Sequence, residues 1–291
     1  MDGAQLDKRR VRASFERAAT DYDRVAVLQR EVGTRLLERL DLIKIGPQRV
    51  LDLGSGTGHI ARALVKRYRA ASVVALDIAA PMLLQARSRS GWWRRPRFVC
   101  GDIERLPFAD HSADMILSNL TLQWCNSLDA TFAEFRRVLR PGGLLLFTSF
   151  GPDTLLELRA AWAAADDYSH VNRFLDMHDV GDALLRAGLA EPVLDVERFT
   201  LTYPDVQGLV RDLKTLGAHN VTAGRPRGLT GRGRWQTLRD TYETFRTAQG
   251  LLPATYEVVY GHAWAAEPRA RAEPGTVKVP LSDLAGRSAK T

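Results

Sequence analysis

Short apolar runs alternate with segments of helical periodicity through the first 150 residues of the chain. The apolar runs predict strands at 49–53, 72–76, 97–100, 113–117 and 144–150. The segments between them predict helices at 60–68, 81–87 and 128–139, the last ended by Pro141, Gly142 and Gly143. Strands separated by helices form a parallel sheet with helices on both faces. The sequence therefore predicts an α/β fold with a doubly wound sheet.

The second half of the chain is less regular. Its patterns predict helices at 179–187, 205–216 and 235–248, and strands at 193–203 and 254–265. Four glycines and one proline indicate a loop at 224–233. We divide the chain into an N-terminal helical cover (1–44), a main domain (45–265) with insertions at about 151–175 and 204–250, and a tail (266–291). The tail lacks periodicity from Glu267 onward, which predicts disorder.

Composition excludes several classes of protein. The 291 residues are 45% hydrophobic and 26% charged, as in an ordinary globular protein. Cys100 and Cys125 lie in no C-x-x-C pair and have no histidine at ligand spacing, so we expect neither a metal site nor a disulfide scaffold. No window approaches a membrane span, and the first residues lack the apolar run of a signal peptide. We therefore expect a cytoplasmic protein with no membrane partner.

Basic residues are concentrated late in the chain. Lys and Arg outnumber Asp and Glu by 41 to 34, and residues 208–246 hold eight of these basic residues against three acids. Four of them lie in or just after the predicted loop, and we call them the loop arginines: Arg225, Arg227, Arg232 and Arg234. Such a segment favours an acidic partner, protein or nucleic acid, by raising the encounter rate. The alternative is a solvated helix face.

A glycine-rich turn stands where the first strand meets the first helix, and residues 50–58 read VLDLGSGTG. Gly54, Gly56 and Gly58 allow the backbone to approach a ligand closely. The dinucleotide fingerprint G-x-G-x-x-G would need its third glycine where this chain has His59. Asp52 stands beside the turn, where a dinucleotide would place its pyrophosphate. A carboxylate there favours a cationic ligand.

Two further acids end the next two strands. Asp77 occupies the position from which α/β nucleotide sites bind ribose hydroxyls, and Asp102 can accept a hydrogen bond from the exocyclic amine of an adenine. Either acid alone would more often be a helix cap or a solvated turn. With Asp52 they lie at the carboxyl ends of successive strands and face one crevice. S-adenosylmethionine, a nucleoside bearing ammonium and sulfonium charges, fits this crevice better than a phosphate-rich cofactor.

On these motifs the chain resembles the seven-stranded S-adenosylmethionine-dependent methyltransferases. The resemblance rests on residues 50–58, 75–77, 101–103, 114–119 and 139–143 and spans 45–150. It implies a last strand antiparallel to the others, a methyltransferase domain at 45–265, and cofactor contacts by Gly54, Gly56, Asp77 and Asp102. It also places Met82 against the adenine, although a core methionine is an equal alternative. The complete predicted cofactor set is Asp52, Gly54, Gly56, Gly58, Asp77, Met82, Asp102, Ile103 and Asn119.

Some acceptors are disfavoured by missing motifs. Enzymes that methylate planar amino groups carry an Asn/Asp-Pro-Pro-aromatic run after the fourth strand, and this chain has Ser-Asn-Leu-Thr at 118–121. Cytosine C5 methylation needs a nucleophilic cysteine, commonly in Pro-Cys or Thr-Cys. Cys100 follows Val99 and Cys125 follows Trp124, so neither is a good candidate.

Four further stretches resemble one subfamily, the malonyl-acyl-carrier protein methyltransferases of biotin synthesis: 15–30, 118–125, 170–174 and 211–218. With them the resemblance covers 13–265. It implies methyl transfer to the free carboxylate of a malonyl thioester on an acidic carrier protein. Methylation of another small acid, such as trans-aconitate, or of RNA remains an alternative, as does a non-catalytic binding module.

The malonyl carboxylate defines what the acceptor site needs. With a pKa of about 4 it is already ionised at neutral pH and requires no general base. We predict Arg173 as a bidentate carboxylate clamp and Tyr22, on the N-terminal cover, as a hydroxyl donor. A surface arginine and a core tyrosine are the alternatives. The residues predicted to bind substrate or carrier protein are Arg211, Lys214, Arg225 and Arg227.

Overall fold

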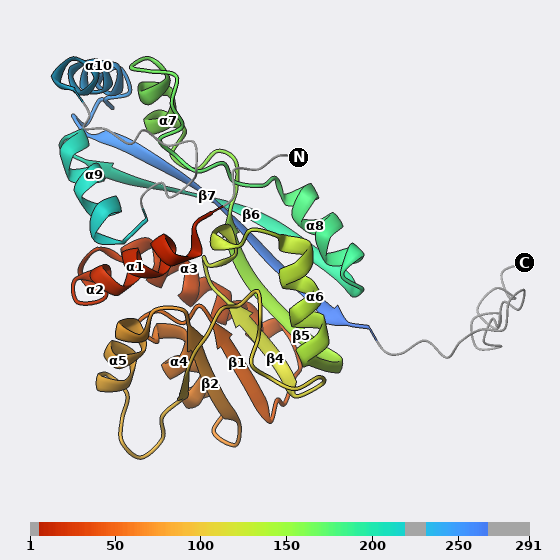
Figure 1. Ribbon diagram of the computed structural model, residues 1–291. Coiled ribbons are helices and arrows are strands. Elements are labelled where there is room, and N and C mark those ends of the chain that lie inside the picture. The colour runs from red at the N-terminus through yellow and green to blue at the C-terminus, as the bar shows by residue number, and fades with distance from the viewer. Residues whose placement is uncertain (1–5, 219–230, 267–291) are drawn as a thin grey trace, which may run out of the picture.

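A seven-stranded sheet forms the centre of the protein in a computed structural model that describes residues 6–218 and 231–266 (Figure 1). The strands are β1 (Arg49–Leu53), β2 (Ser72–Asp77), β3 (Arg97–Cys100), β4 (Ala113–Ser118), β5 (Leu139–Phe150), β6 (Leu189–Tyr203) and β7 (Leu252–Ala265). Their order is β3-β2-β1-β4-β5-β7-β6, and β1 to β5 pair in parallel. β7 is antiparallel to both of its neighbours. The predicted doubly wound sheet with an antiparallel last strand is confirmed.

Helices pack on both faces of the sheet. One face is covered by α3 (Val27–Glu38) and α4 (His59–Arg67), and the other by α6 (Leu128–Val138) and α8 (Met177–Arg186). α5 (Ala80–Ser88) packs against β2 and β3. Because a strand is pleated, successive side chains point to opposite faces of the sheet and pack into different core layers. Val50 joins the layer under α3 and α4, and Leu51 joins the layer under α6.

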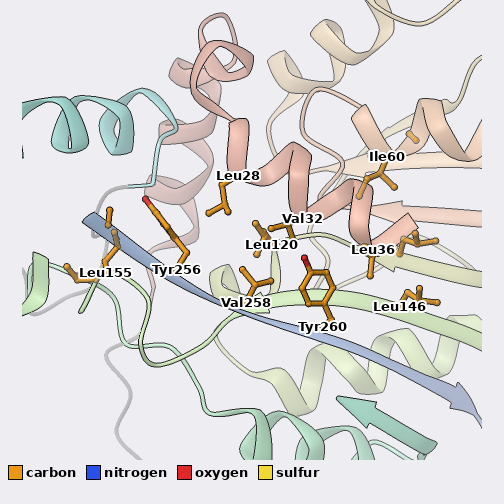
Figure 2. Close-up of a cluster of buried hydrophobic side chains, with 14 of the residues drawn as sticks. Leu28, Val32, Leu36, Ile60, Leu120, Leu146, Leu155, Tyr256, Val258 and Tyr260 are labelled. Carbon is orange, nitrogen blue, oxygen red and sulfur yellow. The ribbon is translucent and has the colours of Figure 1, made fainter. Parts of the chain in front are cut away.

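The larger core layer extends from α3 to β7. Figure 2 shows Leu28, Val32 and Leu36 of α3 beside Val258 and Tyr260 of β7, and all five side chains are buried. Fully burying a leucine or valine contributes about 1.5–3 kcal/mol. Packing of α3 therefore anchors the N-terminal segment on the sheet.

The N-terminal segment continues from α3 across the carboxyl ends of the first strands. It consists of α1 (Lys8–Ala18), α2 (Tyr22–Val25), α3 and a 3-10 turn, η1 (Arg39–Leu42). The carboxylate of Asp7 caps α1 by accepting hydrogen bonds from the backbone N–H groups of Arg9 and Arg10. Ala18 and Ala19 pack on Ala79 and Met82 at the start of α5. These contacts hold α1 above the sheet edge where the predicted acids lie.

Three further helices lie beyond one end of the sheet, at the top of Figure 1: α7 (Leu156–Ala163), α9 (Val206–Thr215) and α10 (Arg232–Glu243). The buried carboxylate of Glu157 in α7 accepts hydrogen bonds from the backbone N–H and the hydroxyl of Thr255 in β7. These bonds fix α7 to the sheet. Across the described parts of the chain, no helix has the length and apolar character needed to span a membrane.

Several predicted boundaries were wrong. β5 begins at Leu139 instead of residue 144, because Leu139 pairs with Ala113 across a register shift. β6 begins at Leu189 and also contains an irregularity before Val193. α10 begins inside the predicted loop and ends at Glu243, since Arg246 turns back to hydrogen-bond the carbonyl of Pro204. The rest of that loop, at 224–230, and the tail from 267 lie outside the described residues.

Candidate active site

The glycine turn after β1 is bound to the end of β2. The N–H groups of Gly54 and Ser55 both donate to the carbonyl oxygen of Leu76, at 2.8 and 2.9 Å. Gly54 has a φ of +75°, and a Cβ on this residue would lie 2.2 Å from the hydroxyl oxygen of Thr121. Only glycine fits this close approach. The turn is thereby held over the carboxyl ends of β1 and β2.

Asp77 links this turn to the start of α5. Its side chain is buried, with 8% of the residue exposed. One carboxylate oxygen accepts a hydrogen bond from Gly56 N–H at 2.8 Å, and the other accepts one from Ala79 N–H at 2.8 Å. Burial raises the pKa of Asp77, and these backbone N–H groups oppose that change. Since a carboxylate has about four acceptor positions, each oxygen can still accept a bond from a ligand hydroxyl.

A cavity of about 620 Å³ opens above Asp77, between the sheet edge and α1. We call it the central cavity. Seven predicted cofactor residues line it: Gly54, Gly56, Asp77, Met82, Asp102, Ile103 and Asn119. They converge because β1, β2 and β3 end in register, with Leu53 opposite Leu76 and Asp77 opposite Cys100. The cavity combines apolar walls with two carboxylates, an arrangement that suits a nucleoside.

Asp52 faces a second, smaller cavity on the other side of the glycine turn, which we call the small cavity. The residue is 1% exposed, and its Oδ2 atom has no hydrogen-bond partner within the described part of the chain. Burial raises the pKa of Asp52 to about 7. A buried, unpartnered carboxylate oxygen suits a cationic group. Gly58 lines neither of these two cavities; it is the N-cap residue of α4, and a Cβ on it would lie 2.8 Å from that of Ala86.

Tyr22 lies where the central and small cavities meet. It is the first residue of α2, and this short helix is fixed by Asp23. The Asp23 carboxylate accepts a hydrogen bond from the Thr57 hydroxyl at 2.6 Å and pairs with Arg89. Burial raises the pKa of Tyr22 well above its ordinary value, and the charges of Asp77 and Asp23 raise it further. The phenol therefore remains protonated at neutral pH and is a hydrogen-bond donor.

A third cavity, of about 950 Å³, lies between α7, α9 and β7. We call it the upper cavity. Its walls are mainly apolar, formed by Phe150, Leu155, Leu158, Phe174, Val210, Leu213 and Tyr256 among others. Lys214 is the single lysine or arginine among the described residues that line it. The upper cavity shares Trp124 with the central cavity and Gln29 with the small cavity, so the three adjoin.

Buried amide groups supply further polarity in the upper cavity. The side-chain oxygens of Gln29, Gln123 and Asn172 are buried and have no hydrogen-bond partner within the described residues. His170 stacks on Trp162 with ring centroids 3.7 Å apart and hydrogen-bonds the Asp166 carboxylate at 2.8 Å. Burial would raise the pKa of Asp166, but this hydrogen bond and the Tyr168 N–H hold it below its ordinary value. The upper cavity therefore has a small group of polar side chains within a mainly apolar lining.

The structure does not place Arg173 in this cavity. Its neighbours Asn172 and Phe174 line the upper cavity, whereas Arg173 is exposed and lines none of the three. Arg211 and Lys214, both on α9, are exposed; Lys214 lines the upper cavity, and Arg211 lines none of the three cavities. The predicted Arg225 and Arg227 lie outside the described residues.

The chain matches a methyltransferase domain family over residues 51–147. The malonyl-[acyl-carrier protein] O-methyltransferase of Gallionella capsiferriformans (strain ES-2) is 56% identical over 270 residues, covering 91% of this chain and 93% of that protein. The enzyme of the same name from Methylovorus sp. (strain MP688) is 57% identical over 276 residues, covering 93% and 92%. The chain belongs to the malonyl-[acyl-carrier protein] O-methyltransferase family.

The fold is also found in more distant proteins. A putative methyltransferase from Bacillus halodurans, of known structure, superimposes with a TM-score of 0.59 at 20% identity, covering 81% of this chain and 99% of that one. At this identity the likeness concerns the fold alone.

Sequence reasoning missed the residues that cover the central cavity. Lys8 lies with its Nζ 3.1 Å from an Asp102 carboxylate oxygen and also pairs with Glu104. Phe15 of α1 meets Trp124 edge to face, with ring centroids 5.2 Å apart. Phe15 and Trp124 both lie in stretches that carry the family resemblance, but no pattern along the chain indicated their contact. Lys8 and Glu104 gave no such signal.

Proposed function

We propose that this protein transfers the methyl group of S-adenosylmethionine to the free carboxylate of a malonyl group on acyl-carrier protein, forming a methyl ester. The observation that carries the proposal is the junction of two unlike cavities. The central cavity has the buried Asp77 in its floor, and it adjoins an apolar upper cavity with one lysine. Relatives that are 56% and 57% identical over nearly their full length bear the corresponding name.

The residues of the central cavity suit S-adenosylmethionine. Asp77 retains acceptor positions for two ribose hydroxyls, since each of its oxygens receives one backbone N–H. Met82 and Ile103 supply apolar surface for the adenine, and Asp102 supplies a carboxylate at its edge. The unpartnered oxygen of Asp52 in the small cavity suits the ammonium group. These residues match a cationic nucleoside better than a phosphate-bearing one.

The reaction needs little proton transfer. S-adenosylmethionine supplies a methyl group on a positively charged sulfur, so a C–O bond to the carboxylate forms as the C–S bond breaks and both charges are neutralised. The acceptor is already ionised, with a pKa of about 4. The protein must therefore align the carboxylate and exclude water. Phe15 and Trp124 close the cavity, and the protonated Tyr22 hydroxyl can donate to a carboxylate oxygen without acting as a base.

For the acceptor carboxylate we assign Lys214 and the amide side chains of Gln123 and Asn172. Among the described residues that line this cavity, Lys214 is the one lysine or arginine, and its charge attracts an anionic acyl group into an otherwise apolar space. The Gln123 amide nitrogen donates one N–H to the carbonyl of Leu120, at 2.7 Å, so its second N–H and the amide of Asn172 are the groups that can donate to the carboxylate oxygens. This assignment replaces the predicted Arg173 clamp, because Arg173 is exposed and lines none of the three adjoining cavities. The anchor is thus a point charge with hydrogen-bond donors rather than a bidentate guanidinium.

Carrier-protein docking is assigned to the α9 and α10 side of the upper cavity. Arg211 on α9 and Arg232, Arg234 and Arg239 on α10 are exposed there. Acyl-carrier proteins are strongly acidic, so this surface complements them. Docking here would present the malonyl thioester to the upper cavity beside Lys214.

The direct test is methyl transfer by the purified full chain from S-adenosylmethionine labelled in its methyl group. Acceptors are malonyl-carrier protein, carrier protein without an acyl group, malonyl-coenzyme A, trans-aconitate and bulk RNA. We expect label on malonyl-carrier protein that is released by mild base, as a carboxyl ester is. Carrier protein without an acyl group is the control, and we expect it to remain unlabelled. Preferential labelling of trans-aconitate or RNA would contradict the proposal.

A further inference from the structure

A strongly basic stretch lies outside the segment that sequence reasoning singled out. Residues 53–101 contain nine Lys and Arg but a single acid, Asp77, which is buried in the active site. The formal charge of this stretch, +8, exceeds the +7 of the whole chain. The stretch therefore carries a large local excess of positive charge.

Most of these basic side chains form no ion pair with another described residue. Arg67 pairs with Asp41, and Arg89 pairs with Asp23. Six others are exposed and form no ion pair with any described residue: Lys66, Arg69, Arg87, Arg94, Arg95 and Arg97. Arg94 donates a hydrogen bond to the backbone carbonyl of Arg69, so the α4–β2 and α5–β3 loops lie side by side. Their charges therefore belong to one surface.

Two tryptophans project from the same surface. Trp92 and Trp93 are 84% and 82% exposed, with ring centroids 5.5 Å apart, and Leu84 on α5 is 65% exposed. Tryptophan is highly buried on average, and neighbouring exposed apolar side chains mark interaction sites. We call residues 89–97 the tryptophan loop; it also contains Arg94, Arg95 and Arg97.

The tryptophan loop lies away from the active site. It enters β3 at that strand's amino end, whereas Asp77 and Gly54 lie at the carboxyl ends of the strands. At about 3.3 Å per residue, the six residues of β2 separate the two sheet edges by roughly 20 Å. In Figure 1, α5 is at the lower side of the molecule and α9 and α10 are at the upper side. A carrier protein docked beside the upper cavity would not cover this loop.

We propose that the tryptophan loop and the adjoining basic side chains bind the surface of a membrane that contains anionic phospholipid. Indole rings favour the interface between headgroups and acyl chains, and arginines pair with lipid phosphates. The loop projects two indoles beside each other, which a fluid interface accepts without a matching pocket. Like charge opposes a second copy of the same surface. The predicted absence of a membrane partner is thereby revised to peripheral contact without a spanning segment.

The test is sedimentation of the full chain with vesicles at low salt. One set is phosphatidylcholine alone, and the other is equal parts phosphatidylcholine and phosphatidylglycerol. We expect binding to the anionic vesicles that weakens as salt is raised, and little binding to the neutral ones. Trp92→Ala/Trp93→Ala should lower this binding at least about tenfold. Arg94→Glu/Arg95→Glu/Arg97→Glu should do the same, since each charge near an anionic surface is worth roughly fivefold.

A matched variant controls for total charge. Arg211→Glu/Arg232→Glu/Arg239→Glu removes the same number of exposed arginines from α9 and α10, and it should retain vesicle binding. Calorimetric binding of S-adenosylmethionine verifies that each variant is folded. The proposal is overturned if anionic vesicles are bound no better than neutral ones, or if the α9–α10 variant loses as much binding as the loop variants. It is also overturned if the loop residues bind single-stranded RNA and not vesicles. These outcomes are independent of methyl transfer.

Discussion

Asp77→Ala should weaken the binding of S-adenosylmethionine, and a second carboxylate in the same sheet provides the control. Asp77 accepts two backbone N–H bonds at the carboxyl end of β2. Asp114 accepts two, from Gln48 and Arg49, at the amino end of β4, at 2.8 and 2.7 Å. Asp114 lines none of the three cavities. Comparing the two alanine variants separates loss of a ligand contact from loss of backbone hydrogen bonds.

The expected magnitude follows from the hydrogen bonds involved. A bond to a charged group is worth about 1.5–3 kcal/mol, so losing even one ribose contact should raise the dissociation constant at least about tenfold. Asp114→Ala should change that constant less than about twofold, because such distant substitutions do not couple to the site.

For thermal stability we expect the opposite order, with the larger loss in Asp114→Ala. Burial would raise the pKa of Asp114, but bonds from the Arg49 and Gln48 amides and the charge of Arg140 hold it below its ordinary value. The ionised Asp114 therefore stabilises the fold at neutral pH, and this contribution is lost as pH falls through its lowered pKa. Asp77 has a raised pKa, so its charge opposes folding at neutral pH when no ligand is bound. Asp77→Ala should therefore lower Tm less than Asp114→Ala does.

Isothermal titration calorimetry measures the affinities, and thermal unfolding without ligand measures stability. Unchanged affinity in a folded Asp77→Ala protein would refute the assignment of Asp77 to the ribose. A comparable loss of affinity in Asp114→Ala would show that the effect is carried by the fold and not by a ligand contact.

Four further predictions concern the acceptor side and the small cavity. In steady-state assays, Lys214→Met should raise KM for malonyl-carrier protein at least about tenfold with cofactor affinity unchanged, whereas Arg173→Met should change this KM less than about twofold. The reverse order would support Arg173 as the carboxylate clamp. Tyr22→Phe should lower kcat while calorimetry finds the cofactor still bound, and wild-type kcat should show no loss from phenol ionisation up to about pH 10. Cofactor affinity should rise, by up to about tenfold, as pH increases through the Asp52 pKa of about 7, because the ionised carboxylate attracts a cation. An equal rise in the Asp52→Asn variant would show that another group causes the pH dependence. Changing all four loop arginines to Glu should reduce kcat/KM for malonyl-carrier protein, with a loss that shrinks as salt rises, but not for a small malonyl thioester; equal losses on both substrates would rule out a docking role.

Much of the cofactor side was predictable from the sequence because its signals are local. Apolar runs and helical periodicity located β1 to β4 to within a residue or so. Parallel connections place the carboxyl ends of these strands at one edge, so acids that follow them must converge. Asp77 and Asp102 line the central cavity accordingly. Gly54 was identifiable from the glycine-rich motif, and its φ of +75° and the close approach of Thr121 explain why glycine is required there.

The cover of the central cavity and the lining of the upper cavity depended on the tertiary structure. Lys8 and Asp102 are separated by 94 positions, and the Ser14 hydroxyl meets the carbonyl of Gly217 across 203, so no sequence period links them. Arg173 is exposed, whereas its neighbours Asn172 and Phe174 line the upper cavity, and no local pattern in the sequence indicates this difference. Phe174 packs against Phe150, with ring centroids 5.5 Å apart, and this contact joins two separate segments. Local pattern therefore determined the fold and the convergence of Asp77 and Asp102 on one cavity, while long-range packing decided that Lys214, and not Arg173, lines the upper cavity.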